Sequence, residues 1–468
     1  MRKQFFSFLI LLSFVLSVAA QKAQVAKPDL AAQNLRRHVA YLAADRLEGR
    51  RTGEQGATFA AGYVANMFAQ YKLKAGFRGA NGKMNFLQPF PYIPRDAKGE
   101  IMTDAKPLEA YNVIGVLDGT DAVLKNEIIV VGAHYDHLGK GGMGSLAANS
   151  TEIHHGADDN ASGVAAMLEL ARRFAAEKKN KRTIVFAAFG GEEEGLLGSK
   201  FYINNPSFPL DKTVAMINLD MVGRLNENKL NVGGIGTASE WKSLVENENI
   251  PPVYRLAENT KPAPNPALKP DSNPAPNNEI VGLTGLGGGM PKLFALQLSE
   301  DGFGPSDHSA FYAKQIPVLF FFTGAHADYH KPTDTAEKVN YEGLLKITNY
   351  VSEILKTIDE NPKRPTYAVA KSTVTGGRAS FNVTIGVVPS YAESDGGLVL
   401  DGVRDGSPAA VAGIKAGDKI IKFAGREIRN IKDYTSVLGE LKADTEYEIE
   451  VVRGAETLTL KVKPAARK

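Results

Sequence analysis

The chain has 468 residues, of which 43% are hydrophobic and 23% charged, and its 55 Lys and Arg nearly balance its 52 Asp and Glu. This composition predicts a folded protein of two or three domains, and it excludes wholesale disorder and the strong positive field of a nucleic-acid-binding protein. The sequence contains no cysteine, which excludes disulfide scaffolds, thiolate metal sites and a cysteine nucleophile. A metal ion would therefore have to be held by His, Asp and Glu.

The first twenty residues predict a signal peptide. Arg2 and Lys3 precede an apolar run over 5–18, and Val18-Ala19-Ala20 places small residues where a signal peptidase cuts. The run is shorter than the roughly 20 residues that a membrane span requires. We therefore expect cleavage near Ala20, a mature chain without a membrane span, and a location in the periplasm or outside the cell.

The region over 21–360 predicts an α/β domain, because apolar strand segments alternate with amphipathic helical segments. Helices are expected over 34–44, 56–72, 162–178 and 341–358, and strands over 111–117, 127–133, 183–189, 213–219 and 316–322. Nearly continuous apolar strands indicate burial on both faces, as in a mixed, mostly parallel sheet flanked by helices. A Pro-rich stretch over 258–278 interrupts this pattern and is expected to be a surface insertion.

The pattern changes after a polar stretch over 361–378, which contains several prolines and glycines and predicts a linker. Residues 379–466 then predict a second, smaller and mostly β domain. Its strands are expected over 397–400, 419–423, 447–451 and 458–462. The last two strands alternate strictly in polarity around a turn at Arg453-Gly454, which is typical of a hairpin with one buried face.

Polar residues follow directly on several strands of the predicted α/β domain. His134, Asp136 and His137 come after 127–133, Glu192-Glu193-Glu194 comes after 183–189, and Asp220 comes after 213–219. The carboxyl ends of parallel strands share one edge of a sheet, which is where α/β proteins bind ligands. Histidine and carboxylate without thiolate suit Zn²⁺, Co²⁺ or Mn²⁺, and two ions about 3.5–4 Å apart require a bridging carboxylate.

These residues resemble the M28 metallopeptidases, the co-catalytic zinc aminopeptidases, over roughly 30–360. The resemblance is carried, in matching order and spacing, by Gly132-Ala133-His134-Tyr135-Asp136, Gly156 to Gly163, Gly191 to Ser199, Ile217 to Asp220 and Asp328-Tyr329-His330. It implies a zinc-aminopeptidase fold and two Zn²⁺ ions, with Co²⁺ or Mn²⁺ as possible substitutes. It also implies that a metal-bound hydroxide hydrolyses the peptide bond that releases an N-terminal residue.

The resemblance further assigns the five metal ligands. Asp159 would bridge both ions, because it stands three residues before Ser162 as the bridging carboxylate does in the family. Its partners would be His134 and Asp220 at one ion, and Glu193 and His330 at the other.

Three further residues receive catalytic roles from the same resemblance. Glu192 would be the general base that takes a proton from the attacking water and delivers it to the leaving amine. Asp136 would orient His134 through the other nitrogen of its ring. Tyr329 would donate a hydrogen bond to the tetrahedral oxyanion.

Other polar residues receive structural interpretations. Glu194 is expected to be a solvated residue of an acidic turn, and Asp158 to hydrogen-bond the backbone. The triplet Ser306-Asp307-His308 is expected to be a loop network, since no Gly-x-Ser-x-Gly elbow accompanies it. Surface positions are expected for His38 and His326, and structural positions near the crevice for His137, His154 and His155.

The C-terminal domain resembles a PDZ domain. The segments that carry this resemblance are Gly397 to Val403, Gly406-Ser407-Pro408-Ala409-Ala410, Ala412 to Lys415 and Ala416 to Ile420. It implies binding of the C-terminal strand of a peptide at a sheet edge. The alternative is a small β domain that only packs against the catalytic unit.

Two other functions stay open beside the aminopeptidase. The first is a carboxypeptidase or a glutaminyl-cyclase-like metalloenzyme, although the cyclase relatives use a single zinc and the sequence offers five ligands. The second is a non-catalytic PDZ-type peptide-binding protein, which would have no use for an unliganded Glu192. Peptides are the expected partners in each case, and nucleic acid is not.

Overall fold

The computed structural model describes residues 29–94, 102, 104–142, 144–147, 150–259, 290–370, 383–389, 396–403, 406–429 and 431–466. The predicted signal peptide, almost all of the Pro-rich insertion and residues 371–378 of the predicted linker lie outside these ranges. None of the helices within them combines the length and the apolar character that crossing a bilayer requires.

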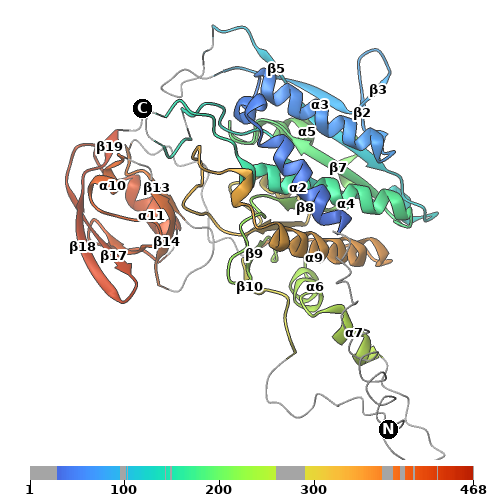
Figure 1. Cartoon of the computed structure of the whole chain (residues 1–468). Coiled ribbons are helices and arrows are strands. Elements are labelled where there is room, and N and C mark those ends of the chain that lie inside the picture. Colours follow the sequence, from blue (N-terminus) through green and yellow to red (C-terminus); the bar gives the residue numbers. More distant parts are fainter. Residues whose placement is uncertain are drawn as a thin grey trace, which may run out of the picture.

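A nine-stranded mixed sheet organises the first part of the chain (Figure 1). Four parallel strands form its centre, in the order β7 (Thr183–Phe189), β6 (Ile128–His134), β8 (Thr213–Leu219) and β11 (Val318–Phe322). The strands predicted over 183–189 and 213–219 are confirmed residue for residue. The predicted mixed sheet with a parallel centre is therefore confirmed.

Antiparallel pairing occurs toward both edges of this sheet. Beside β7 lies β5 (Leu108–Leu117), which also pairs with β1 (Lys74–Ala75) and β4 (Leu87–Tyr92). Beyond β11 lie β9 (Lys229–Gly233) and β10 (Ala295–Leu298), which run parallel to each other. A separate short hairpin joins β2 (Phe77–Arg78) to β3 (Met84–Asn85).

Helices bury both faces of the sheet. One face packs on α2 (Leu30–Leu42), α3 (Gln55–Gln70), α4 (Gly163–Glu177), α6 (Trp241–Glu248) and α9 (Tyr341–Glu360). The other face packs on α5 (Leu197–Asn204) and α8 (His308–Tyr312), and α7 (Pro252–Asn259) follows α6 in the chain. The four helices predicted from periodicity are present as α2, α3, α4 and α9, with ends shifted by a few residues.

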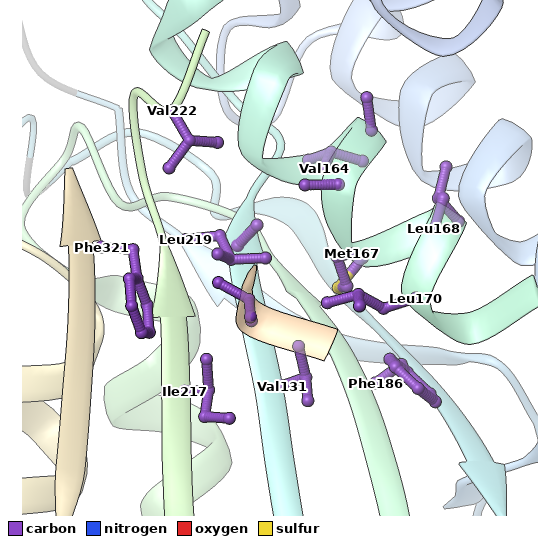
Figure 2. Close-up of a cluster of buried hydrophobic side chains, with 14 of the residues drawn as sticks. Val131, Val164, Met167, Leu168, Leu170, Phe186, Ile217, Leu219, Val222 and Phe321 are labelled. Atoms are coloured by element: carbon purple, nitrogen blue, oxygen red, sulfur yellow. The ribbon is translucent and has the colours of Figure 1, made fainter. Parts of the chain in front are cut away.

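The larger core lies between the parallel strands and α4 (Figure 2). Val131, Phe186 and Ile217 project from β6, β7 and β8 toward Met167 and Leu170 of α4. All five side chains are fully buried. Because these apolar contacts fix the strands against α4, the strand ends and the turn that precedes α4 are held in a defined relative position.

The C-terminal part of the chain has a core of its own, which supports the predicted separate β domain. Its strands are β12 (Val383–Thr384), β13 (Val387–Pro389), β14 (Leu398–Val403), β15 (Lys419–Phe423), β16 (Arg426–Glu427), β17 (Tyr447–Arg453), β18 (Glu456–Val462) and β19 (Ala465–Ala466). Its helices are α10 (Pro408–Val411) and α11 (Ile431–Leu438). Ser407 caps α10 by accepting a hydrogen bond from the Ala410 N–H at 3.2 Å.

The predicted linker begins as a segment that packs on the α/β unit. Thr366 donates its side-chain hydroxyl to Glu240 at 2.8 Å, and Tyr367 forms an isolated β-bridge with Ala238. The Ala370 N–H donates to the Tyr312 hydroxyl at 3.0 Å. Residues 361–370 are thus anchored to the first unit rather than free of it.

Candidate metal centre

The ends of the parallel strands place the predicted site residues at one edge of the sheet. His134 is the last residue of β6, Asp220 directly follows β8, and Glu192 and Glu193 follow β7 after Gly190-Gly191. Because β7, β6 and β8 are adjacent and parallel, their carboxyl ends bring these residues together at the same edge of the sheet.

Asp159 reaches the same edge from the turn Ala157–Ser162 that precedes α4. The carboxylate of Asp334 fixes this turn, because its Oδ2 accepts the N–H groups of Asp158 at 2.8 Å and of Asp159 at 3.2 Å. Gly156, at a φ of 54°, starts the turn, and a Cβ there would lie 2.1 Å from the Asp159 carbonyl oxygen. Only glycine fits that position.

The first candidate metal site consists of His134, Asp159 and Asp220. His134 Nε2 lies 3.2 Å from Asp159 Oδ1 and 3.2 Å from Asp220 Oδ1. All three residues are buried, and their ligand atoms are close enough to hold one ion. This is the set that the sequence predicted for one of the two ions.

The second candidate site lies on the other oxygen of Asp159. His330 Nε2 is 3.1 Å from Asp159 Oδ2 and 3.3 Å from Glu193 Oε2, and His330 Nδ1 donates to the Gly144 carbonyl at 2.8 Å. Asp159 is therefore the carboxylate common to both clusters, as expected of a bridging residue.

His137 also joins the second cluster, which the sequence interpretation did not foresee. Its Nδ1 lies 2.8 Å from Glu193 Oε1 and 3.9 Å from Asp159 Oδ2. The residue comes directly after Asp136 at the end of a buried strand. This position next to Asp136 was the signal in the sequence for a role at the site. The contact itself could not be predicted, because its partner Glu193 is 56 residues away in the chain.

The donor set of this structure fits two zinc ions. Among the described residues, Asp159, Glu193 and Asp220 have only histidine rings as ion-pair partners, and none of the three pairs with a Lys or Arg side chain. Buried carboxylates of like charge are costly unless a cation compensates them. Histidine nitrogen and carboxylate oxygen are ligands that Zn²⁺ accepts.

Glu192 lies beside this cluster and has no basic side chain as a partner among the residues described. Its side chain is buried. Burial raises the pKa of the Glu192 carboxyl well above its ordinary value, with Glu193 and Asp220 adding to the rise and His134 opposing it. A carboxyl with a raised pKa is suited to accepting and returning a proton near neutral pH.

The expected contact between Asp136 and the His134 ring differs in the structure. His134 Nδ1 is hydrogen-bonded to the backbone carbonyl of Asp136 at 3.2 Å, whereas the Asp136 carboxylate is 3.7 Å away. The carboxylate instead accepts the Thr52 hydroxyl at 2.8 Å and the Glu192 N–H at 3.1 Å. Asp136 thus holds His134 through its main chain and Glu192 through its side chain.

Tyr329 stacks on the ring of His330, with ring centroids 3.8 Å apart. Burial raises the pKa of its hydroxyl well above the ordinary value, and the charges of Asp159 and Glu193 add to that rise. The hydroxyl therefore stays protonated and able to donate beside the metal cluster. Its expected hydrogen bond to an oxyanion stays a prediction.

Three structural interpretations from the sequence are wrong. Glu194 is buried and pairs with Arg51 at 3.2 Å rather than facing solvent. His38 is fully buried, and its ring contacts the hydroxyls of Tyr63 at 2.7 Å and Tyr71 at 3.1 Å. The third is His326, which is largely covered and lies 3.2 Å from the Asp158 carboxylate. In each case the partner comes from a distant part of the sequence, which local polarity does not reveal.

The remaining structural interpretations are confirmed. Asp158 accepts the Gly223 N–H at 2.6 Å and the Ser162 hydroxyl at 2.9 Å, so it braces the backbone. The Ser306-Asp307-His308 triplet is no catalytic triad, because Ser306 accepts from Asn218 and His308 stacks on Phe320. The rings of His154 and His155 also make structural hydrogen bonds, the first with the Ser145 hydroxyl and the second with the Ala43 carbonyl.

Arg50 is a positioning residue that the sequence interpretation missed. Its buried guanidinium donates to the carbonyls of Tyr135 at 2.7 Å, His155 at 2.8 Å and Gly156 at 2.9 Å, and also to that of Leu42. It thereby ties the loop after β6 to the turn that carries Asp159. Burial lowers the pKa of Arg50 to about 10, although nearby carboxylates oppose the shift.

Comparison with known proteins identifies two families along the chain. The model of peptidase family M28 matches residues 112–294 and 289–355, and that of the PDZ domain matches residues 383–463. A probable zinc metalloprotease of Pyrenophora teres f. teres is 41% identical over 25% of this chain and 23% of its own length. Aminopeptidase YwaD of Bacillus subtilis is 28% identical over 54% of this chain and 46% of its own.

The solved aminopeptidase from Aneurinibacillus sp. strain AM-1 aligns with 74% of this chain and 96% of its own, at 19% identity and a TM-score of 0.47. The matched part of this chain spans from about a quarter to about half of the length of the curated relatives above.

Proposed function

The chain belongs to peptidase family M28, and from that membership we propose that it is a two-zinc aminopeptidase that releases N-terminal residues from peptides. One observation carries the proposal: two clusters of ligand atoms share Asp159, beside a buried Glu192 that has no basic partner in the part of the chain that the structure describes. The similarity to aminopeptidase YwaD supports the same activity.

The metal ligands divide around Asp159. His134 and Asp220 would hold one Zn²⁺ with Asp159 Oδ1, and His330 and Glu193 would hold the other with Asp159 Oδ2. When bound, such ions lower the pKa of a coordinated water toward neutrality and polarise the scissile carbonyl.

The protein's own groups then move the proton. Glu192, whose pKa is raised, takes a proton from the attacking water and passes it to the departing amine. Asp136 accepts the main-chain N–H of Glu192 and so holds the backbone of the base in place. Tyr329 stays protonated and donates to the developing oxyanion.

The basic side chains around the centre favour a substrate amine over a substrate carboxylate. The two zinc ions would compensate the charge of the metal-binding carboxylates, so the preference rests on these basic side chains. The nearby guanidinium groups have partners: Arg50 donates to carbonyls, Arg51 pairs with Glu194, and Arg224 pairs with Asp328 and Asp334. A carboxypeptidase would need such a cation for the substrate's C-terminus, so this arrangement supports the aminopeptidase.

Two further parts of the proposal concern the rest of the chain. The PDZ domain would bind the C-terminal strand of a peptide, and residues 1–20 would direct export and be cleaved near Ala20. The intact mass of the protein recovered from its host tests the cleavage, because a chain that retains residues 1–20 would contradict it.

Metal analysis tests the core of the proposal. The purified chain should contain two zinc ions, and Asp159→Asn should lose both, because both clusters depend on this residue. Asp220→Asn should lose only one of the two. A wild-type chain that binds one ion or none under saturating zinc would contradict the two-metal assignment.

A further inference from the structure

His137 occupies a closely defined position next to the second cluster. It is buried, its N–H donates to the Arg50 carbonyl at 3.2 Å, and it forms an isolated parallel bridge with Arg51. A Cβ on Gly156 would come within 2.6 Å of its ring, so the ring fills the space that this glycine leaves. The backbone contacts on one side and Gly156 on the other leave the ring little freedom.

The distances around Glu193 decide whether His137 acts as a ligand or through another residue. Two ligand atoms on one tetrahedral zinc lie about 3.3 Å apart, given zinc-to-ligand distances of about 2.0–2.1 Å. His330 Nε2 meets this condition, at 3.1 Å from Asp159 and 3.3 Å from Glu193. His137 Nδ1 does not, because it is 2.8 Å from Glu193 Oε1 but 3.9 Å from Asp159 Oδ2.

We infer that His137 is a positioning residue, which donates from Nδ1 to Glu193 Oε1 and so leaves Glu193 Oε2 to bind the metal ion beside His330. The inference rests on the proposed two-zinc function. The 2.8 Å contact has the length of a charge-assisted hydrogen bond. Held in this way, the Glu193 carboxylate binds through one chosen oxygen and cannot rotate to bind through both.

The other ring nitrogen of His137 is consistent with this assignment. With the proton on Nδ1, Nε2 is an acceptor, and it is buried without a hydrogen-bond partner among the described residues. A buried acceptor without a partner costs free energy. Among the described residues, the polar contacts of the His137 side chain are both with metal-binding carboxylates, Glu193 at 2.8 Å and Asp159 at 3.9 Å, which favours a role toward the metal over a role in packing.

The test compares zinc binding by the full-length wild type, His137→Ala and His137→Asn. Each chain is stripped of metal and titrated with zinc against a chromophoric chelator. Asn keeps an N–H donor near the position of Nδ1 but offers no zinc-binding nitrogen. His155→Ala is the matched control, because His155 lies close in the sequence and, among the described residues, its side chain has polar contacts with the Ala43 carbonyl and Asp45 rather than with the metal cluster.

We expect His137→Ala to bind one zinc as the wild type does and the other about 10–100-fold more weakly. His137→Asn should restore the affinity for that second zinc, and His155→Ala should leave both affinities unchanged. Circular dichroism of the metal-free chains separates a loss of fold from a loss of metal binding.

Each of the other outcomes overturns the inference in a distinguishable way. If His137→Ala and His137→Asn both lose the second zinc, His137 is a ligand. If His137→Ala lowers the melting temperature but leaves both zinc affinities unchanged, the role is structural. If the wild type itself binds fewer than two zinc ions, the proposed function fails and this inference fails with it.

Discussion

The carboxylate of Asp136 accepts a hydrogen bond of 3.1 Å from the main-chain N–H of Glu192. The loop after β6 therefore holds the residue that follows β7, and the proposed general base is fixed through its backbone rather than its side chain. Thr52 donates to the second oxygen of Asp136 at 2.8 Å, so the carboxylate is itself held by the segment that precedes α3. Among the described residues, the carboxyl group of Glu192 has no hydrogen-bond or ion-pair partner, so the backbone contact holds the base while its carboxyl group stays available.

Asp136→Asn should lower kcat by about 10–100-fold while the chain keeps its zinc. The amide offers one acceptor oxygen in place of two, so either the Glu192 N–H or the Thr52 hydroxyl loses its partner. Steady-state kinetics together with metal analysis measure both quantities. An unchanged kcat would show that Asp136 does not act through Glu192. A fall in activity that is explained by a loss of bound zinc would show the same.

Glu192→Gln should reduce kcat by about 10²–10⁴-fold with both zinc ions retained, because the amide cannot accept the proton. Glu194→Gln is the matched control, since this neighbouring carboxylate pairs with Arg51 rather than facing the metal cluster. It should retain most of the activity. Similar losses in the two variants would remove Glu192 from the proposed role.

Arg50→Lys should destabilise the folded chain by at least ~3 kcal/mol, although the positive charge is kept. Lysine cannot reach the carbonyls of Leu42, Tyr135, His155 and Gly156 together, and buried carbonyls are then left without donors. Urea denaturation of the metal-free chain measures the effect. A change within ~0.5 kcal/mol, the usual range for surface positions, would show that Arg50 does not hold the two loops together.

His38 should make the stability of the chain depend on pH. Burial, with the charge of Arg37 adding to it, lowers the pKa of His38 to about 4, below its ordinary value of 6.5. Between these two values the unfolded chain binds a proton that the folded chain does not, so stability falls as the pH falls from about 6.5 to about 4. Above that window the contribution of His38 is constant.

His38→Gln should flatten this dependence by up to about 1.4 kcal/mol per pH unit within the window. The free energy of unfolding, measured by denaturant at several pH values on metal-free chains, provides the comparison. His155→Gln serves as the control, because His155 is partly exposed. Parallel curves for wild type and His38→Gln would contradict the buried, neutral state of His38.

The sequence predicted the centre of the fold well and its edges poorly, for physical reasons. β7 and β8 are largely apolar segments between polar turns, and both were predicted without error. β4 was missed because it contains Pro89 and Pro91, which are compatible only with an edge strand, and it pairs with β5 alone. β10 has only four residues, too few for a periodic pattern.

The site shows the same division. The five proposed metal ligands lie in motifs with regular order and spacing, so the sequence alone could indicate them. The contacts of His137 with Glu193 and of Arg50 with four carbonyls depend on which loops meet in space. No spacing within the sequence signals such contacts, and the same holds for the buried position of His38 between Tyr63 and Tyr71.

The most direct test of the account is hydrolysis of aminoacyl-anilides by the purified chain, with each substrate presented both free and Nα-acetylated. The account predicts cleavage of the free substrates only, complete loss of activity after chelation, and recovery when zinc is restored. Cleavage of the acetylated substrates alone, or activity that survives removal of all metal, would contradict it.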